Sequence, residues 1–134
     1  MYPRFDPAAS LRIWAVEATL GGRLLRMPPL PAPDWLPVIM AGDVMGAKEL
    51  LEDFRLAECL LAGEFTVAQL RETLTEMIEE ATGRTAVAAF AIAGAAAGRW
   101  DVIGADVARA GVQFDQISIA AGLDALYASV LRHM

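Results

Sequence analysis

The pattern of apolar and polar positions changes along the chain, from an extended run with a glycine turn to helical spacing. Residues 13–20 form an extended, largely apolar run. Gly21 and Gly22 follow, and two glycines accept the positive φ angles that a two-residue hairpin turn requires. Residues 23–27 then supply a return strand. The sequence therefore predicts a β-hairpin within residues 10–28.

A proline-rich segment follows the hairpin. Proline lacks a backbone N–H, so Pro28 ends the ladder, and the prolines together hold residues 29–34 near polyproline II as a stiff linker. The segment also contains a minimal PxxP pattern without a flanking basic cluster, which favours a spacer over a recognition motif. Asp34 is placed to cap a helix that begins with Trp35 and Leu36. The prolines are Pro28, Pro29, Pro31 and Pro33.

Apolar residues recur at helical spacing over the rest of the chain. The best-defined segment has Thr66 and Gln69 in a capping-box pattern, then an apolar stripe that ends at Gly83. The other segments have one apolar side or end at a glycine. We expect helices over residues 35–41, 47–61, 66–83, 85–97, 100–110 and from residue 118 onward.

The segment 85–97 differs from the others because it is apolar all round. Such a helix is expected between other elements rather than on the surface. Gly94 and Gly98 have the spacing that lets two helix backbones approach closely. This spacing favours packing inside the protein over contact with another subunit.

These elements predict an α+β fold that is predominantly α, in which an N-terminal β-hairpin precedes a bundle of about five helices. A length of 134 residues and a hydrophobic content of 56% suit one domain over residues 1–134. Within it we expect the hairpin (10–28), the proline-rich linker (29–34) and a helical part (35–134). The hairpin must dock on the helices because two strands alone are marginally stable.

Composition narrows the choice of partner. The net charge of −6 provides no basic field for nucleic acid or for an anionic membrane surface, so a neutral or basic protein partner fits better. The longest uncharged stretch, 85–98, is shorter than the ~20 residues that cross a bilayer. Residues 1–7 lack the apolar core of a signal peptide. We therefore expect an intracellular protein without membrane or nucleic-acid partners.

Side chains that could support catalysis are few. The single histidine, His133, is next to the last residue, and Cys59 is the only cysteine, so neither an internal disulfide nor a two-cysteine metal site is possible. Phosphate loops, nucleophile elbows and paired-histidine metal motifs do not occur. Four carboxylates on one predicted helix favour a solvated face over a metal site: Glu72, Glu76, Glu79 and Glu80. We expect no enzymatic activity, no catalytic residue, no cofactor and no metal.

Two regions of the chain resemble a known family. The first is the glycine turn, short strand and proline-rich linker followed by Asp34-Trp35-Leu36. The second comprises Trp100, Gly104, Gly111-Val112 and the run 118–127. In this order they resemble the tail-assembly chaperones that long-tailed bacteriophages of high-GC, actinobacterial-type hosts encode. Residues 84–98 depart from that family in being richer in alanine.

The resemblance implies a protein of the host bacterial cytoplasm that acts during virion assembly. Such a chaperone binds the tape-measure protein, keeps its hydrophobic helices from aggregating and helps the tail-tube protein to polymerise. We expect non-covalent contacts in which an amphipathic client helix lies in an apolar groove. For each single candidate partner-binding residue an ordinary place in the core is the favoured alternative: Trp35, Leu36, Leu123, Leu126, Tyr127 and Val130.

Two alternatives remain open. An exposed hairpin edge could pair with another copy and produce a homo-oligomer. The chain could also be a structural virion protein, a tail-completion or connector component that forms a ring. A stable ring of many copies in solution favours the structural component, whereas a monomer or small oligomer that dissolves a tape-measure fragment favours the chaperone.

Overall fold

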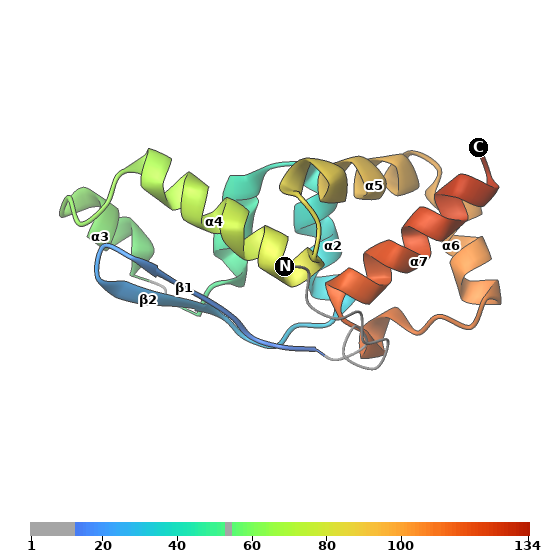
Figure 1. Cartoon of the computed structure of the whole chain (residues 1–134), viewed down its shortest axis with the longest axis horizontal. Coiled ribbons are helices and arrows are strands. Elements are labelled where there is room, and N and C mark those ends of the chain that lie inside the picture. The colour runs from blue at the N-terminus through green and yellow to red at the C-terminus, as the bar shows by residue number, and fades with distance from the viewer. Residues whose placement is uncertain (1–12, 53–54) are drawn as a thin grey trace, which may run out of the picture.

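The structure, a computed structural model, describes residues 13–52 and 55–134. It confirms an α+β fold that is predominantly α, with a two-stranded antiparallel hairpin ahead of the helices (Figure 1). The described elements run in the order β1 (Val16–Leu20), β2 (Arg23–Met27), α2 (Ala32–Ala41), the 3₁₀ helix η1 (Val44–Leu50), α3 (Leu56–Leu61), α4 (Val67–Thr82), α5 (Ala86–Gly98), α6 (Trp100–Arg109), the 3₁₀ helix η2 (Phe114–Gln116) and α7 (Ile119–Arg132).

The hairpin forms as the glycine pair predicts. Gly21 and Gly22 have φ angles of 58° and 75°, and the turn brings Leu20 opposite Arg23. Alternation along the strands then points one face toward α4 and the core. Residues 10–12 of the predicted hairpin lie outside the described residues. The buried side chains of this face are Val16, Leu20, Leu25 and Met27.

The opposite face of the hairpin carries charges. Arg26 Nε lies 3.3 Å from a carboxylate oxygen of Glu17, and its Nη1 lies 2.6 Å from Glu52 Oε1. The Glu52 backbone N–H also donates to the Arg26 carbonyl oxygen at 2.9 Å. The segment after η1 is thereby fastened to the outer edge of β2.

The start of the first helix corrects the prediction for the linker. Helix α2 begins at Ala32 rather than Trp35, so Pro33 belongs to its first turn, and no side chain caps it. Proline is accepted there because the first helical N–H groups have no partner inside the helix. The Ala32 N–H instead donates to the Ile117 carbonyl oxygen at 2.9 Å. The capping role expected of Asp34 is therefore wrong, although its carboxylate still lies in the first turn.

The predicted continuous helix over 47–61 is also wrong. The 3₁₀ helix η1 ends at Leu50, Leu51 is extended with φ −74° and ψ 143°, and α3 starts at Leu56. An unbroken helix would use the Glu52 N–H internally, whereas here that group bonds to β2. The contact with the hairpin thus replaces about one turn of helix.

Helix α4 matches its prediction closely. Thr66 Oγ1 accepts from the Gln69 N–H, the Gln69 side chain accepts from the Thr66 N–H, and Gly83 ends the helix with φ 68°. Glu79 also has a structural role, because its carboxylate accepts a hydrogen bond from the Ala86 N–H at the start of α5. The prediction that the four α4 carboxylates form a solvated face therefore does not hold for Glu79, which connects α4 to the start of α5.

The prediction that helix α5 lies between other elements rather than on the surface is wrong for one of its faces. One face packs on α2 and α7 and is buried. On the opposite face Val87 is 80% exposed, and a Cβ added at Gly94 or Gly98 would meet no atom within 4 Å. The preference for internal packing of this glycine pair is therefore wrong, because both glycines face outward. Uniform apolar composition conceals which face is buried.

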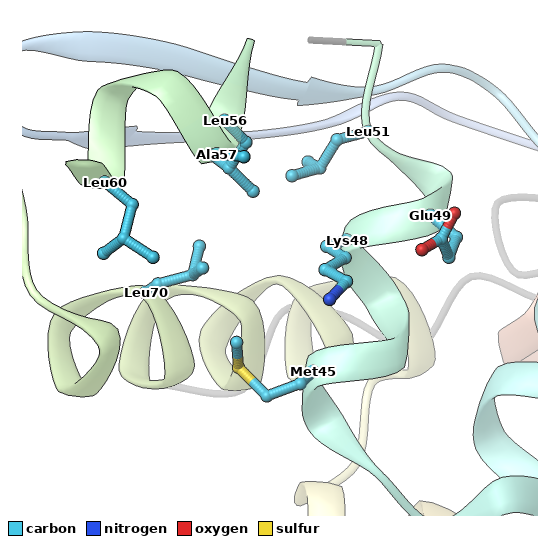
Figure 2. Close-up of a pocket in the computed structure, with 8 residues that line it drawn as sticks. All are labelled: Met45, Lys48, Glu49, Leu51, Leu56, Ala57, Leu60 and Leu70. Atoms are coloured by element: carbon cyan, nitrogen blue, oxygen red, sulfur yellow. The ribbon is translucent and has the colours of Figure 1, made fainter. Parts of the chain in front are cut away.

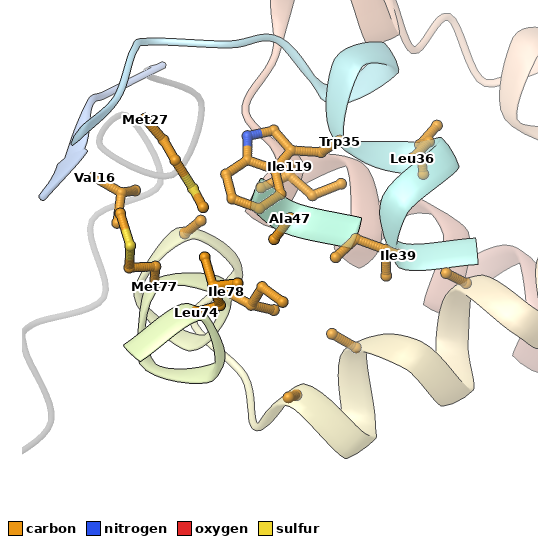
Figure 3. Packing of buried hydrophobic residues seen from close by; sticks show 14 of the residues in the cluster. Val16, Met27, Trp35, Leu36, Ile39, Ala47, Leu74, Met77, Ile78 and Ile119 are labelled. Carbon is orange, nitrogen blue, oxygen red and sulfur yellow. The ribbon is translucent and has the colours of Figure 1, made fainter. Parts of the chain in front are cut away.

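The buried apolar side chains form one cluster that extends from the hairpin to α7. Figure 3 shows Trp35 within it, among Met27, Ala47 and Ile119. Met77 belongs to the same cluster and ties α4 to it. Trp35 thus joins the hairpin, η1 and α7 through a single side chain.

Helices α5 and α6 meet at a bend of 99°. Within the described part of the chain no single helix has both the length and the apolar character to span a bilayer. Only this bent pair, taken together, has that length and composition.

A polar clamp holds α6 to α7: Ser129 Oγ donates to Asp106 Oδ2 at 2.7 Å, and the Arg132 guanidinium donates to the same oxygen. The Arg99 side chain donates to the His133 carbonyl oxygen at 2.6 Å.

This clamp predicts a pH dependence of stability. Hydrogen bonds from Arg132 and then Ser129 lower the pKa of Asp106 from 3.8 to about 2. A lowered native pKa stabilises the fold above the ordinary pKa, and the contribution is lost as the pH falls through the native value. The unfolding free energy of Asp106→Asn should therefore lie below that of the wild type at pH 5 and approach it towards pH 2. Urea titrations across this range measure the difference, with Asp101→Asn as the control.

Candidate partner-binding groove

An apolar groove lies between η1, α3 and α4 (Figure 2). We call it the α3–α4 groove. Its volume of about 350 Å³ is at the lower end of the range for ligand pockets. Six apolar side chains and two charged ones line it: Met45, Leu51, Leu56, Ala57, Leu60 and Leu70, with Lys48 and Glu49.

The break after η1 creates this groove. Extended backbone at Leu51 lets the chain turn, so that α3 lies beside the first turns of α4 rather than extending η1. Gly63, with φ +77°, then reverses the chain between α3 and α4. Leu56 and Leu70 are buried and form the inner wall, whereas Leu60 is half-buried. A continuous helix over 47–61 would leave no such groove.

Large apolar side chains continue from the groove onto the surface. Leu61 is 88% exposed and lies one helical turn after Ala57. Val67 is 49% exposed and lies one turn before Leu70 on α4. Single exposed apolar residues are ordinary, but here two of them adjoin an apolar hollow. The groove and its rim can therefore receive apolar side chains from another molecule.

The two charged residues of the groove differ in direction. Figure 2 shows the Lys48 side chain extending from η1 toward α4, and the Glu49 carboxylate directed to the other side of η1. Lys48 is the only lysine of the chain. Its ammonium group makes no hydrogen bond or ion pair with any residue of the described part. The groove thus combines an apolar lining with an unpaired cation at Lys48, while the Glu49 carboxylate is directed away from the hollow.

Four of the six sequence-predicted residues lie in the core, and Leu36 is one of them at 9% exposed. Trp35 is 3% exposed, and Leu123 and Leu126 are fully buried. These last three cannot contact a partner in this conformation. Leu36 borders a separate, more open α2–α5 cleft of about 520 Å³. Its other lining residues are Pro33, Pro37, Met40, Ala97 and Trp100.

The remaining two predicted residues lie on α7. The Tyr127 ring is 43% exposed, and the Arg84 guanidinium lies 5.4 Å from its centroid while also pairing with Asp124. Val130 borders another hollow, of about 390 Å³, together with Ile103. The structure therefore does not bring the six predicted residues into one surface.

The prediction of one helix over 47–61 with a single buried face does not include the α3–α4 groove. One signal in the sequence bears on it. Leu60 and Leu61 are adjacent and precede Gly63. Neighbouring residues on a helix point about 100° apart, and both are buried only where the apolar face is wide, as for Met77 and Ile78 on α4. The adjacent leucines are therefore only a weak sign of an exposed leucine near residue 60.

The described residues contain no group of three or more His, Cys, Asp or Glu that could hold a metal ion, and Cys59 is buried. Comparisons with protein-family models, curated proteins and solved structures find no match for this chain. The function is therefore inferred from its own residues and geometry.

Proposed function

We propose that this protein is a bacteriophage tail-assembly chaperone that binds the tape-measure protein in the host cytoplasm. Binding is non-covalent, with an apolar client side chain in the α3–α4 groove. The tail-tube protein is a second proposed partner. The observation that carries the proposal is the apolar hollow with Leu61 exposed at its rim.

The geometry suits an amphipathic client helix. Such a helix presents anchors at positions i, i+3, i+4 and i+7, which lie in a row on one face. The groove receives one anchor between Leu60 and Leu70, and Leu61 and Val67 offer apolar contacts on either side. Covering these side chains removes apolar area from water in both molecules, which favours association. No bond is made or broken in this task.

The alternative, a ring-forming virion component, is favoured by one observation on the hairpin. The register directs the backbone N–H and C=O groups of Glu17 and Thr19 away from β2. They have no backbone partner among the described residues, so β1 offers an edge to another copy. Native mass determination decides: a ring of many copies supports the structural role, and a monomer or small oligomer supports the chaperone.

Co-expression with the tape-measure protein of the same genome tests the proposal. We expect the client to become soluble and to co-purify with this chain. Leu61→Ser should weaken the complex about tenfold, because burial of a leucine side chain contributes about 1.5 kcal/mol or more. It should change the unfolding free energy by less than about 0.5 kcal/mol, since the side chain is exposed in the free protein. Calorimetric titration and urea unfolding measure the two quantities.

Leu131→Ser is the matched control, because Leu131 is also an exposed leucine but lies on α7, away from the groove. It should leave client binding unchanged. Equal loss of binding in both variants, or no loss in Leu61→Ser, would contradict the assignment of the α3–α4 groove. Failure of the client to co-purify or to gain solubility would contradict the chaperone role itself.

A further inference from the structure

We infer that the α3–α4 groove selects an acidic amphipathic helix, in which a carboxylate lies one turn from the apolar anchor and pairs with Lys48. This inference rests on the proposed helix-in-groove function and names the chemistry of its partner. It differs from the expectation drawn from composition, because a chain with a net charge of −6 favours a basic partner. The charge at the groove has the opposite sign.

The first step is the position of Lys48. It lines the groove, its side chain extends from η1 toward α4, and its ammonium group has no partner among the described residues (Figure 2). Lysine packs its methylene stem along apolar surface and keeps its charged end in water. A helix that fills the groove would cover the stem and approach the ammonium group.

The second step is the state of the nearby carboxylates. Glu52 pairs with Arg26 at 2.6 Å, and Glu58 pairs with Arg55 at 3.2 Å. Glu49 belongs to the lining of the groove, but its carboxylate points to the other side of η1 (Figure 2). Glu52 and Glu58 are therefore paired with arginines, and the Glu49 carboxylate is directed away from the hollow. The unpaired charge of the groove lining that is not directed away is the cation of Lys48.

The third step is the match of spacing. On a helix, residues three or four positions apart lie on one face, about 5–6 Å from each other. A client leucine between Leu60 and Leu70 would thus carry its neighbour at i+3 or i+4 within reach of a lysine at the rim. A carboxylate there gains an ion pair, whereas a lysine there meets a like charge. An exposed pair contributes about 0.2–1 kcal/mol, which corresponds to a preference of up to about fivefold.

Two synthetic helical peptides test the inference. They share one leucine stripe and differ only in having glutamate or lysine one turn from each leucine. The wild type should bind the glutamate peptide about fivefold more tightly at low salt, and about 0.5 M salt should reduce the preference. Lys48→Gln should remove the preference, and Lys48→Glu should reverse it. Fluorescence anisotropy of labelled peptides measures the affinities.

Arg109→Glu is the matched control, because it changes the net charge by the same amount at an exposed position of α6. It should keep the wild-type preference. If both peptides bind equally and Lys48→Glu alters neither affinity, the inference is wrong although the groove still binds helices. If the wild type binds neither peptide, the proposed groove function fails instead. A wild-type dimer that Lys48→Glu dissociates would also overturn the inference, because a second copy would then occupy the groove.

Discussion

Trp35→Ala is expected to lower the unfolding free energy by about 3–5 kcal/mol, the usual cost of truncating a buried tryptophan. The side chain is 3% exposed and lies among Met27, Ala47 and Ile119. Its removal leaves a cavity where the hairpin, η1 and α7 meet. A free energy of unfolding of about 5–15 kcal/mol is typical of a domain, so the variant should retain only a small part of it. Urea unfolding followed by circular dichroism measures the midpoint and slope.

Trp100→Ala provides the matched control. Trp100 is 43% exposed and borders the open α2–α5 cleft, so the same truncation should cost less than about 1.5 kcal/mol. Similar costs in both variants would contradict the described core. A Trp35→Ala protein with wild-type stability but impaired client binding would instead support the partner-binding role that the family resemblance implies.

Local signals explain what the sequence predicts well. The glycine pair specifies a tight turn through backbone angles alone, and the Thr66–Gln69 box satisfies helix-end N–H groups within four residues. Both depend on neighbours in the chain, so the sequence contains the whole interaction. The hairpin and α4 accordingly appear at the predicted places.

The break in 47–61 shows the opposite case. Apolar spacing there suits a helix, but Glu52 bonds through its backbone to Arg26, which is 26 residues earlier. Periodicity carries no information about a hydrogen bond between distant segments. The groove exists only because of this break, so the apolar spacing of the sequence does not predict it.

The predicted partner-binding residues show a related limit. Leucine, tryptophan and valine on one helix face serve a core or a partner equally well, and only the packing of other elements decides between them. Leu123 and Leu126 are covered inside the protomer, while Leu61 remains uncovered. Hydropathy is the same in both cases. The exposed fraction, which is a property of the fold, separates them.

The junction between the hairpin turn and the groove leads to the second large effect. A Cβ built at Gly21 would lie 2.5 Å from the Glu64 carbonyl oxygen, and its φ is +58°. Glu64 belongs to the short connection between α3 and α4. The hairpin turn therefore supports the connection that places the two walls of the groove side by side.

Gly21→Ala should consequently cost about 2–4 kcal/mol, as the sum of left-handed backbone strain and a clash with backbone that cannot rotate away. Gly22 separates the two contributions, because its φ is +75° and an added Cβ meets nothing within 4 Å. Gly22→Ala should cost only about 1–2 kcal/mol. Urea unfolding of both variants measures the difference.

Since relief of the clash moves the α3–α4 connection, Gly21→Ala should also weaken binding of a helical peptide more than Gly22→Ala does. Equal stability and equal peptide binding in the two variants would show that the turn and the groove are independent.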